Sequence, residues 1–152
     1  FPTGPIRKEG EAALAMLRDD QSHLVLVGLP EDMVVNETIE TFEAIREKVP
    51  GLSMDTILLN RSSVPSLTEE EHGFLAALSD GVKSTGAEEL LWAGRWESQL
   101  EEATAEAQDR LTQRLEARVI QIPRLSHDGG PQQLVHQIAA ALVRASSTRT
   151  DP

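Results

Sequence analysis

Polar side chains follow three apolar segments of the chain, each of which has the length of a β-strand. Glu31 comes after HLVLVGLP, Asn60 closes DTILLN, and the run Pro123, Arg124 and Leu125 follows RVIQI. In open α/β sheets, ligands bind beyond the carboxyl ends of parallel strands. If the three segments are such strands, their tips line one crevice at one edge of a sheet. The sequence therefore predicts a binding site at this edge.

Asn60 and Arg61 form the second tip. A carboxamide presents a hydrogen-bond donor and an acceptor side by side, so it can address the N6 and N7 edge of adenine with two bonds. Asparagine also commonly bonds the backbone of its own turn. Taken alone, Asn60 fits that local role better, and the adenine hypothesis depends on the other tips.

The third and first tips have similar alternatives. The proline ring of Pro123, with the stem of Arg124 or with Leu125, can pack on a purine, although proline also ends strands for its own reasons. The carboxylate of Glu31 could pair with a cation across an interface or lie near the water shell of a metal. The local alternative is that Glu31 and Asp32 favour the start of the next helix through its dipole.

Hydrophobic periodicity predicts a single α/β domain over residues 1–145, followed by a disordered tail at 146–152. The expected helices are 5–19, 34–49, 67–81, a long one ending near 117, and 131–145, and the expected strands are 23–29, 55–60 and 118–122. Apolar strands alternating with helices indicate a parallel sheet with flanking helices on both faces. Because three strands make a narrow sheet with open edges, we expect it to be part of a larger doubly wound sheet or to borrow strands from a partner.

Two details of the predicted helices bear on the site. Ser66 with Glu69, and Thr85 with Glu88, have the spacing of capping boxes and mark helix starts. The apolar stripe of the long helix begins with Trp92 and Trp96. We expect these tryptophans to pack in the core or an interface, although tryptophan also anchors protein partners.

Composition excludes several classes of function. The 152 residues carry a formal net charge of -11, which disfavours nucleic acid and anionic membrane surfaces as partners. There is no cysteine, no apolar run near the roughly 20 residues of a membrane helix, and no signal-peptide pattern. We therefore expect a cytoplasmic protein that has no integral membrane segment and binds no nucleic acid.

The three tip segments together resemble the later half of the ArsA-type ATPases, which include arsenite-pump ATPases and tail-anchored-protein-targeting ATPases. The resemblance covers residues 11 to 143 approximately and rests on LVGLPEDMVVNETIETF, DTILLNR and VIQIPRL. In that family a strand ends in Pro-Glu before a helix with Glu-Thr, the next strand ends in Asn, and a final strand ends in Pro. The matching positions here are Pro30-Glu31, Glu37-Thr38, Asn60 and Pro123.

The resemblance implies a doubly wound P-loop NTPase-like fold of the deviant Walker type, with ATP or ADP and Mg²⁺ as cofactors. It implies that Asn60 contacts adenine and that the loop of Pro123 lines the adenine pocket, so we assign Arg61, Arg124 and Leu125 to nucleotide binding with them. It places Glu31 close to the nucleotide and a dimer interface. The implied partners are a second copy or an upstream P-loop segment, and a protein client.

The phosphate-binding parts of that family do not occur in this sequence. There is no G-x-x-x-x-G-K-[ST] loop, and the metal-ligating acid and switch segment are absent as well. We therefore expect that this chain alone does not hydrolyse ATP, because nothing in it neutralises the phosphates. Two other hypotheses remain open: a stand-alone, non-catalytic α/β interaction module, and a small hydrolase that uses Glu31 and His127.

Overall fold

The computed structural model describes residues 4–78, 87–125 and 130–147. Its helices and strands occur in the predicted order, and their bounds are α1 Pro5–Leu17, β1 His23–Gly28, α2 Asp32–Lys48, β2 Ser53–Ser62, α3 Glu69–Ala77, α4 Ala87–Arg114, β3 Arg118–Pro123 and α5 Gly130–Ser147. The prediction of an α/β chain with a parallel sheet is confirmed. The larger P-loop NTPase-like fold stays a prediction.

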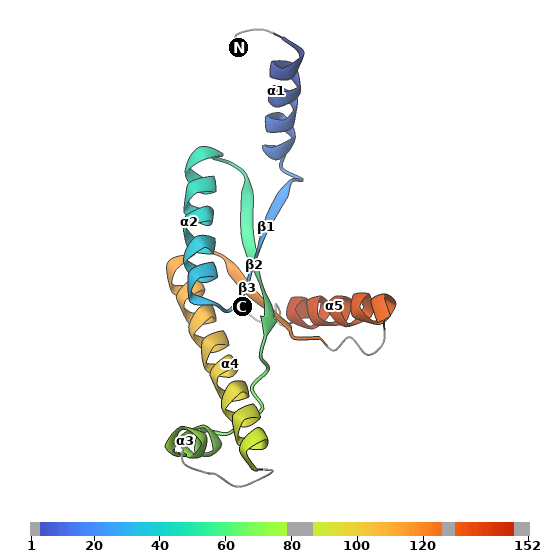
Figure 1. The fold of residues 1–152 in the computed structure, drawn as a ribbon. Coiled ribbons are helices and arrows are strands. Elements are labelled where there is room, and N and C mark those ends of the chain that lie inside the picture. The colour runs from blue at the N-terminus through green and yellow to red at the C-terminus, as the bar shows by residue number, and fades with distance from the viewer. Residues whose placement is uncertain (1–3, 79–86, 126–129, 148–152) are drawn as a thin grey trace.

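The sheet has the order β1-β2-β3, and both strand pairs are parallel. Leu26, Ile57 and Val119 lie side by side across the strands and face α2 and α4. Both helices lie on the same side of the sheet in Figure 1. The core they enclose contains Val35, Ile39, Phe42, Ile57, Leu59, Ala107, Leu111 and Leu115. The predicted apolar stripes of α2 and of the second half of α4 therefore form the core.

The opposite face of the sheet is covered only at β3. Helix α5 lies on that side (Figure 1), where its Ala141 and the β3 residue Ile122 are buried. Val25 and Val27 of β1 remain exposed, with 62% of Val27 accessible. At β1 the expected flanking helices on both faces are not found, because no described helix packs on this side of the strand. Helices do lie on both sides of the sheet, but the second layer is incomplete.

Helix α1 extends past the end of the sheet, as Figure 1 shows, and has no buried residue. Its apolar side chains, such as Ile6 and Met16, are exposed. The link to β1 is fixed locally: Ser22 Oγ donates to the Met16 carbonyl at 2.6 Å, and Asp19 accepts from the Gln21 amide at 2.9 Å. The helix is thus attached to the chain next to it and to no described part of the core.

Gly28 sets the distance between β1 and α2. A Cβ at this position would lie 2.9 Å from the Thr38 hydroxyl oxygen. That hydroxyl is held in place because it donates to the Val34 carbonyl, one turn earlier in α2, at 2.7 Å. Glycine at the end of β1 therefore serves helix packing and is not part of a phosphate loop.

Several local predictions have a different outcome. The capping box of α3 is formed by Thr68 and Glu71, not by Ser66 and Glu69. Helix α5 continues through Ser147, so the predicted tail begins too early, and its residues 148–152 lie outside the described residues. The predicted capping residue Thr85 and the predicted hydrolase residue His127 also lie outside the described residues. Core packing of Trp92 and Trp96 is wrong: they are 66% and 48% exposed, because the first half of α4 runs beyond the sheet (Figure 1).

Candidate functional site

Five of the six predicted site residues line one pocket at the carboxyl ends of β2 and β3. Its volume is about 560 Å³, and its lining residues are Asn60, Arg61, Pro123, Arg124, Leu125 and Leu134. This volume lies within the ~300–1,000 Å³ typical of small-molecule sites. Leu134 comes from α5, where helical periodicity predicts an inward-facing residue. The pocket thus joins two strand tips to the helix that follows β3.

The end of β2 is shaped by a bulge in the parallel ladder. Asn60 pairs with Ile122 and Ser62 with Pro123, so Arg61 is the extra residue between them. Arg61 has φ 58, the one positive φ among the described non-glycine residues. This left-handed conformation costs an L-residue about 1–2 kcal/mol. Bulges reorient side chains near functional sites, and strained backbone clusters there.

The ladder continues beyond the bulge, because the Arg124 amide donates to the Ser62 carbonyl at 3.0 Å. The Ser62 hydroxyl donates back to the Leu59 carbonyl at 2.8 Å. The first bond joins the two strand tips, and the second fixes the backbone of β2 at the bulge. Arg61 and Arg124, which line the pocket, are exposed.

Asn60 uses part of its hydrogen-bonding capacity locally. Its Oδ1 accepts from the Arg61 amide at 3.0 Å, as expected for an asparagine in a turn. The oxygen keeps a second lone pair, and Nδ2 has no hydrogen-bond partner among the described residues. Asn60 can therefore still offer one donor and one acceptor to a ligand.

A second hollow of about 430 Å³ adjoins the pocket and shares Pro123, Arg124 and Leu125 with it. Its other lining residues are Ser62, Ser63, Val64, Ser66 and Glu97. Glu97 accepts a hydrogen bond from the Ser63 hydroxyl. The extra wall is therefore polar and includes one carboxylate from α4.

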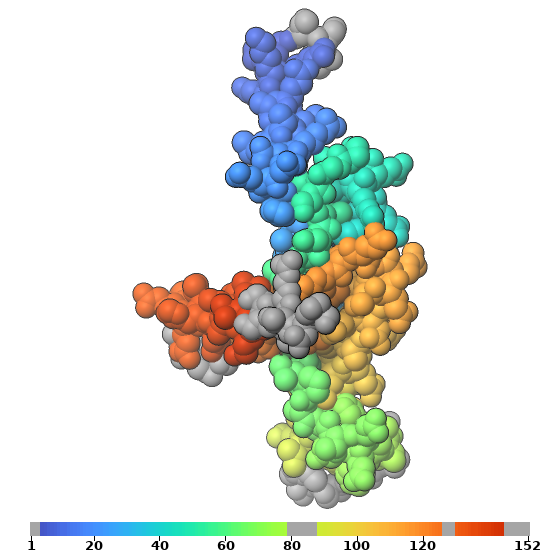
Figure 2. Space-filling model, turned by 180° about the vertical axis from the view of Figure 1, so that it is seen from behind, coloured from blue at the N-terminus to red at the C-terminus, as the bar shows by residue number. Residues whose placement is uncertain are grey.

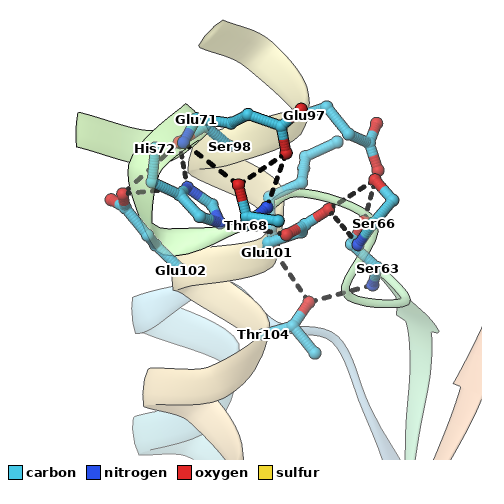
Figure 3. Close-up of polar contacts among 11 residues, drawn as sticks. Ser63, Ser66, Thr68, Glu71, His72, Glu97, Ser98, Glu101, Glu102 and Thr104 are labelled. Carbon is cyan, nitrogen blue, oxygen red and sulfur yellow. Dashed lines mark hydrogen bonds and ion pairs between the residues drawn. The ribbon is translucent and has the colours of Figure 1, made fainter. Parts of the chain in front are cut away.

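Behind this hollow, a polar network holds the segment after β2 and α3 on α4, as Figure 3 shows. Glu101, whose side chain is only 5% exposed, accepts from the Ser66 amide at 2.8 Å and from the Ser66 hydroxyl at 2.7 Å. His72 of α3 lies between Glu101, at 3.1 Å, and the Ser98 hydroxyl, at 2.6 Å. Thr104 accepts from the Ser63 amide at 3.0 Å.

Two carboxylates in this region have lowered pKa values. Burial alone would raise the pKa of Glu101, but hydrogen bonds from Ser66, Leu67 and His72 outweigh it and lower the pKa. The backbone and side-chain hydrogen bonds of Thr68 lower the pKa of Glu71. Both groups are therefore held in the charged form.

The sequence pattern does not predict the network around His72. Ser98, His72 and Glu101 resemble a nucleophile, base and acid in their order of hydrogen bonds, but neither Ser98 nor His72 lines the cavities described above. These contacts hold α3 and the segment after β2 on α4, and we call Ser66, His72, Ser98 and Glu101 the clamp. The polar residues Glu101 and Thr104 are both buried on α4. Their positions in the sequence indicate nothing unusual until the place of α3 is known.

The structure does not bring Glu31 together with the other five predicted residues. Glu31 precedes α2, and its carbonyl accepts from the Val35 amide at 2.9 Å. Its side chain lines a separate depression of about 220 Å³ with Pro30, Asp32, Val35, Ala103, Glu106, Ala107 and Arg110. There Arg110 pairs with Asp32 at 2.7 Å. Within the described ranges, no group of three or more His, Cys, Asp or Glu residues could hold a metal ion.

Comparison with known proteins does not assign the chain to a group: no family model matches it, and no curated protein matches it at a significant level. Among the helices that the structure describes, none combines the length and the apolar character that crossing a membrane requires.

Proposed function

We propose that this chain is the C-terminal portion of an ArsA-type ATPase and supplies the adenine side of its nucleotide site. The observation that carries the proposal is the pocket that Asn60, Arg61, Pro123, Arg124 and Leu125 share. These residues come from two strand tips about 60 positions apart in the sequence. Strand position and resemblance alone predict these residues, and they line one cavity of suitable size.

The chemistry of the pocket fits a purine nucleotide. The Asn60 amide can donate to adenine N7 while its oxygen accepts from N6. Pro123, Leu125 and Leu134 provide apolar surface for the two faces of the base. Arg61 and Arg124 provide positive charge at the mouth, where a ribose phosphate would leave the pocket, in a chain whose net charge is -11.

The phosphate side of the site would come from outside this sequence. In the proposal, an upstream P-loop segment or a second copy of the protein brings the phosphate loop and the Mg²⁺ ligands, and ATP hydrolysis requires that association. The exposed apolar residues of β1, an edge strand of the sheet, and the unburied α1 support this idea, because they leave apolar surface available for such an association. A homodimer and a protein client belong to the same proposal.

The test is a titration of the chain with ADP and GDP, measured by isothermal titration calorimetry. We expect ADP to bind more tightly than GDP, and Asn60→Ala to remove ~1–3 kcal/mol of that discrimination. Asn36→Ala, which makes the same change outside the pocket, is the matched control. Equal discrimination by the parent chain and the Asn60→Ala variant would refute the assignment of adenine.

A non-catalytic interaction module is the second candidate. The exposed apolar side chains of α1 and β1 favour it, because unburied apolar surface of this kind marks sites of association. Analytical ultracentrifugation with and without ADP separates the two candidates. Stable self-association without any ADP binding would favour the module, whereas ADP binding would favour the ATPase portion.

A further inference from the structure

Trp92 and Trp96 form an exposed stacked pair on the first half of α4. Their ring centroids are 5.8 Å apart and the rings are 8° from parallel. They are the two tryptophans of the chain, and both are largely accessible to solvent. Because tryptophan is concentrated at the energetic centres of protein interfaces, an exposed preformed pair is a candidate anchor.

The pair occupies a face of α4 that α3 leaves uncovered. At about 100° per residue, Trp92 and Trp96 lie roughly opposite Gly94 and Ser98. Leu75 of α3 packs against Gly94, since a Cβ there would be 3.1 Å from Leu75 Cδ2. The hydrogen bond between Ser98 and His72 is on the same side. Helix α3 is therefore fastened to the side of α4 that faces away from the tryptophans.

Further along α4, the same face leads to the depression at the tip of β1. Ala103 continues the helical row of the tryptophans and lines the depression. The charged residues there are Glu31, Glu106 and the ion pair of Asp32 with Arg110, so the depression carries a net negative charge. From Trp92 to Glu106 the helix rises about 20 Å. We name this strip, from Trp92 and Trp96 through Ala103 to Glu106, the α4 strip. Its length matches about four turns of a partner helix.

The charge around the α4 strip is strongly acidic. Up to Glu102, the described residues of α4 contain five glutamates, of which Glu101 bonds Ser66 on another face, against one arginine, Arg95. Glu88 and Glu89 lie one turn before Trp92 and therefore flank its face. Arg95 is directed toward α3, because its Nε donates to the Leu75 carbonyl at 3.3 Å. A second copy would add like charges here, so charge complementarity favours a basic partner.

We propose that the α4 strip binds a basic amphipathic helix of another protein. Apolar side chains at helical spacing would cover Trp92 and Trp96, small or apolar ones would pass Ala103, and lysine or arginine residues would meet Glu88 and Glu89 at one end and Glu106 at the other. The proposal rests on α4 and is independent of nucleotide binding in the strand-tip pocket.

The test uses an 18-residue leucine–lysine helical peptide that lacks tryptophan. A leucine–glutamate peptide of the same length is the control of opposite charge. Binding is followed by anisotropy of a fluorophore on the peptide at 150 mM salt, and by a blue shift of the protein's tryptophan emission. We expect the basic peptide to bind and the acidic peptide not to bind. Trp92→Ala should weaken binding at least tenfold, and Ile6→Ala, an exposed apolar change on α1, should leave it within twofold.

Three results would overturn the proposal. Equal binding of the basic peptide by the parent chain and Trp92→Ala would mean that general negative charge attracts it. Equal binding of both peptides would remove the charge argument. A dimer that dissociates when Trp92 or Trp96 is replaced would show that a second copy covers the strip. None of these results depends on ADP, so failure here is distinguishable from failure of the nucleotide proposal.

Discussion

Replacing Gly28 by alanine tests the close contact between β1 and α2. The new Cβ would lie 2.9 Å from Thr38 Oγ1, about 0.5 Å closer than the 3.4 Å at which ordinary contact begins. The hydroxyl cannot move freely, since it is bonded to the Val34 carbonyl. Overpacking of this kind costs about 1–3 kcal/mol of unfolding free energy. For a chain of this size, that corresponds to a fall in Tm of ~2–4 °C per kcal/mol.

A double-mutant cycle with Thr38→Ala isolates the contact. Thr38→Ala alone should cost ~1 kcal/mol, because it removes a methyl group and a hydrogen bond. In the double variant the two Cβ atoms would be 3.9 Å apart, an ordinary contact. Urea unfolding should therefore show the double variant close to Thr38→Ala, with a coupling of 1 kcal/mol or more. Additive costs would refute the steric explanation. Gly73→Ala, whose Cβ meets nothing within 4 Å, is the control and should not destabilise.

The remaining predictions concern the tip of β2 and the network around Glu101. Arg61→Gly should raise stability by about 1 kcal/mol in urea unfolding, since glycine tolerates the left-handed conformation, and it should weaken ADP binding. Arg61→Val should lower stability, and equal stability of the two variants would contradict the backbone strain at this position. Glu101→Ala should cost about 1–3 kcal/mol, because it removes two hydrogen bonds that a charged carboxylate accepts from Ser66, and a cost below 0.5 kcal/mol would contradict the clamp. Because the pKa of Glu101 is lowered in the folded state, its ionisation stabilises the fold at pH values above the ordinary pKa of 4.5. This stability is lost as the pH falls through the lower folded pKa. Glu101→Gln should therefore lose less stability below about pH 4.5 in acid titrations followed by circular dichroism.

The arrangement of helices and strands was predictable because the apolar periods are clear. Val35, Ile39 and Phe42 recur at helical spacing, and all three are buried. The end of β2 was harder to predict: Ser53–Ser62 is longer than the predicted 55–60, because backbone pairing with β3 continues through a bulge that side-chain pattern does not reveal.

The site was predictable only in part. Strand order brings the tips of β2 and β3 together, so Asn60 and Pro123 could be assigned to one pocket from topology. Glu31 follows β1 and directly precedes α2, and it lines another depression together with residues of α4. The clamp around Glu101 depends on where α3 packs, and no local pattern of residues specifies that. The exposure of Trp92 likewise depends on how far α4 extends beyond the sheet.

The most direct measurement of the central claim is a titration of the ¹⁵N-labelled chain with ADP, followed by two-dimensional NMR. The proposal predicts that shift changes concentrate at Asn60, Arg61, Arg124 and Leu125, that the side-chain amide of Asn60 is among them, and that GDP produces smaller changes at the same positions. Absence of shifts at millimolar ADP, or shifts centred on residues outside the strand-tip pocket, would contradict it.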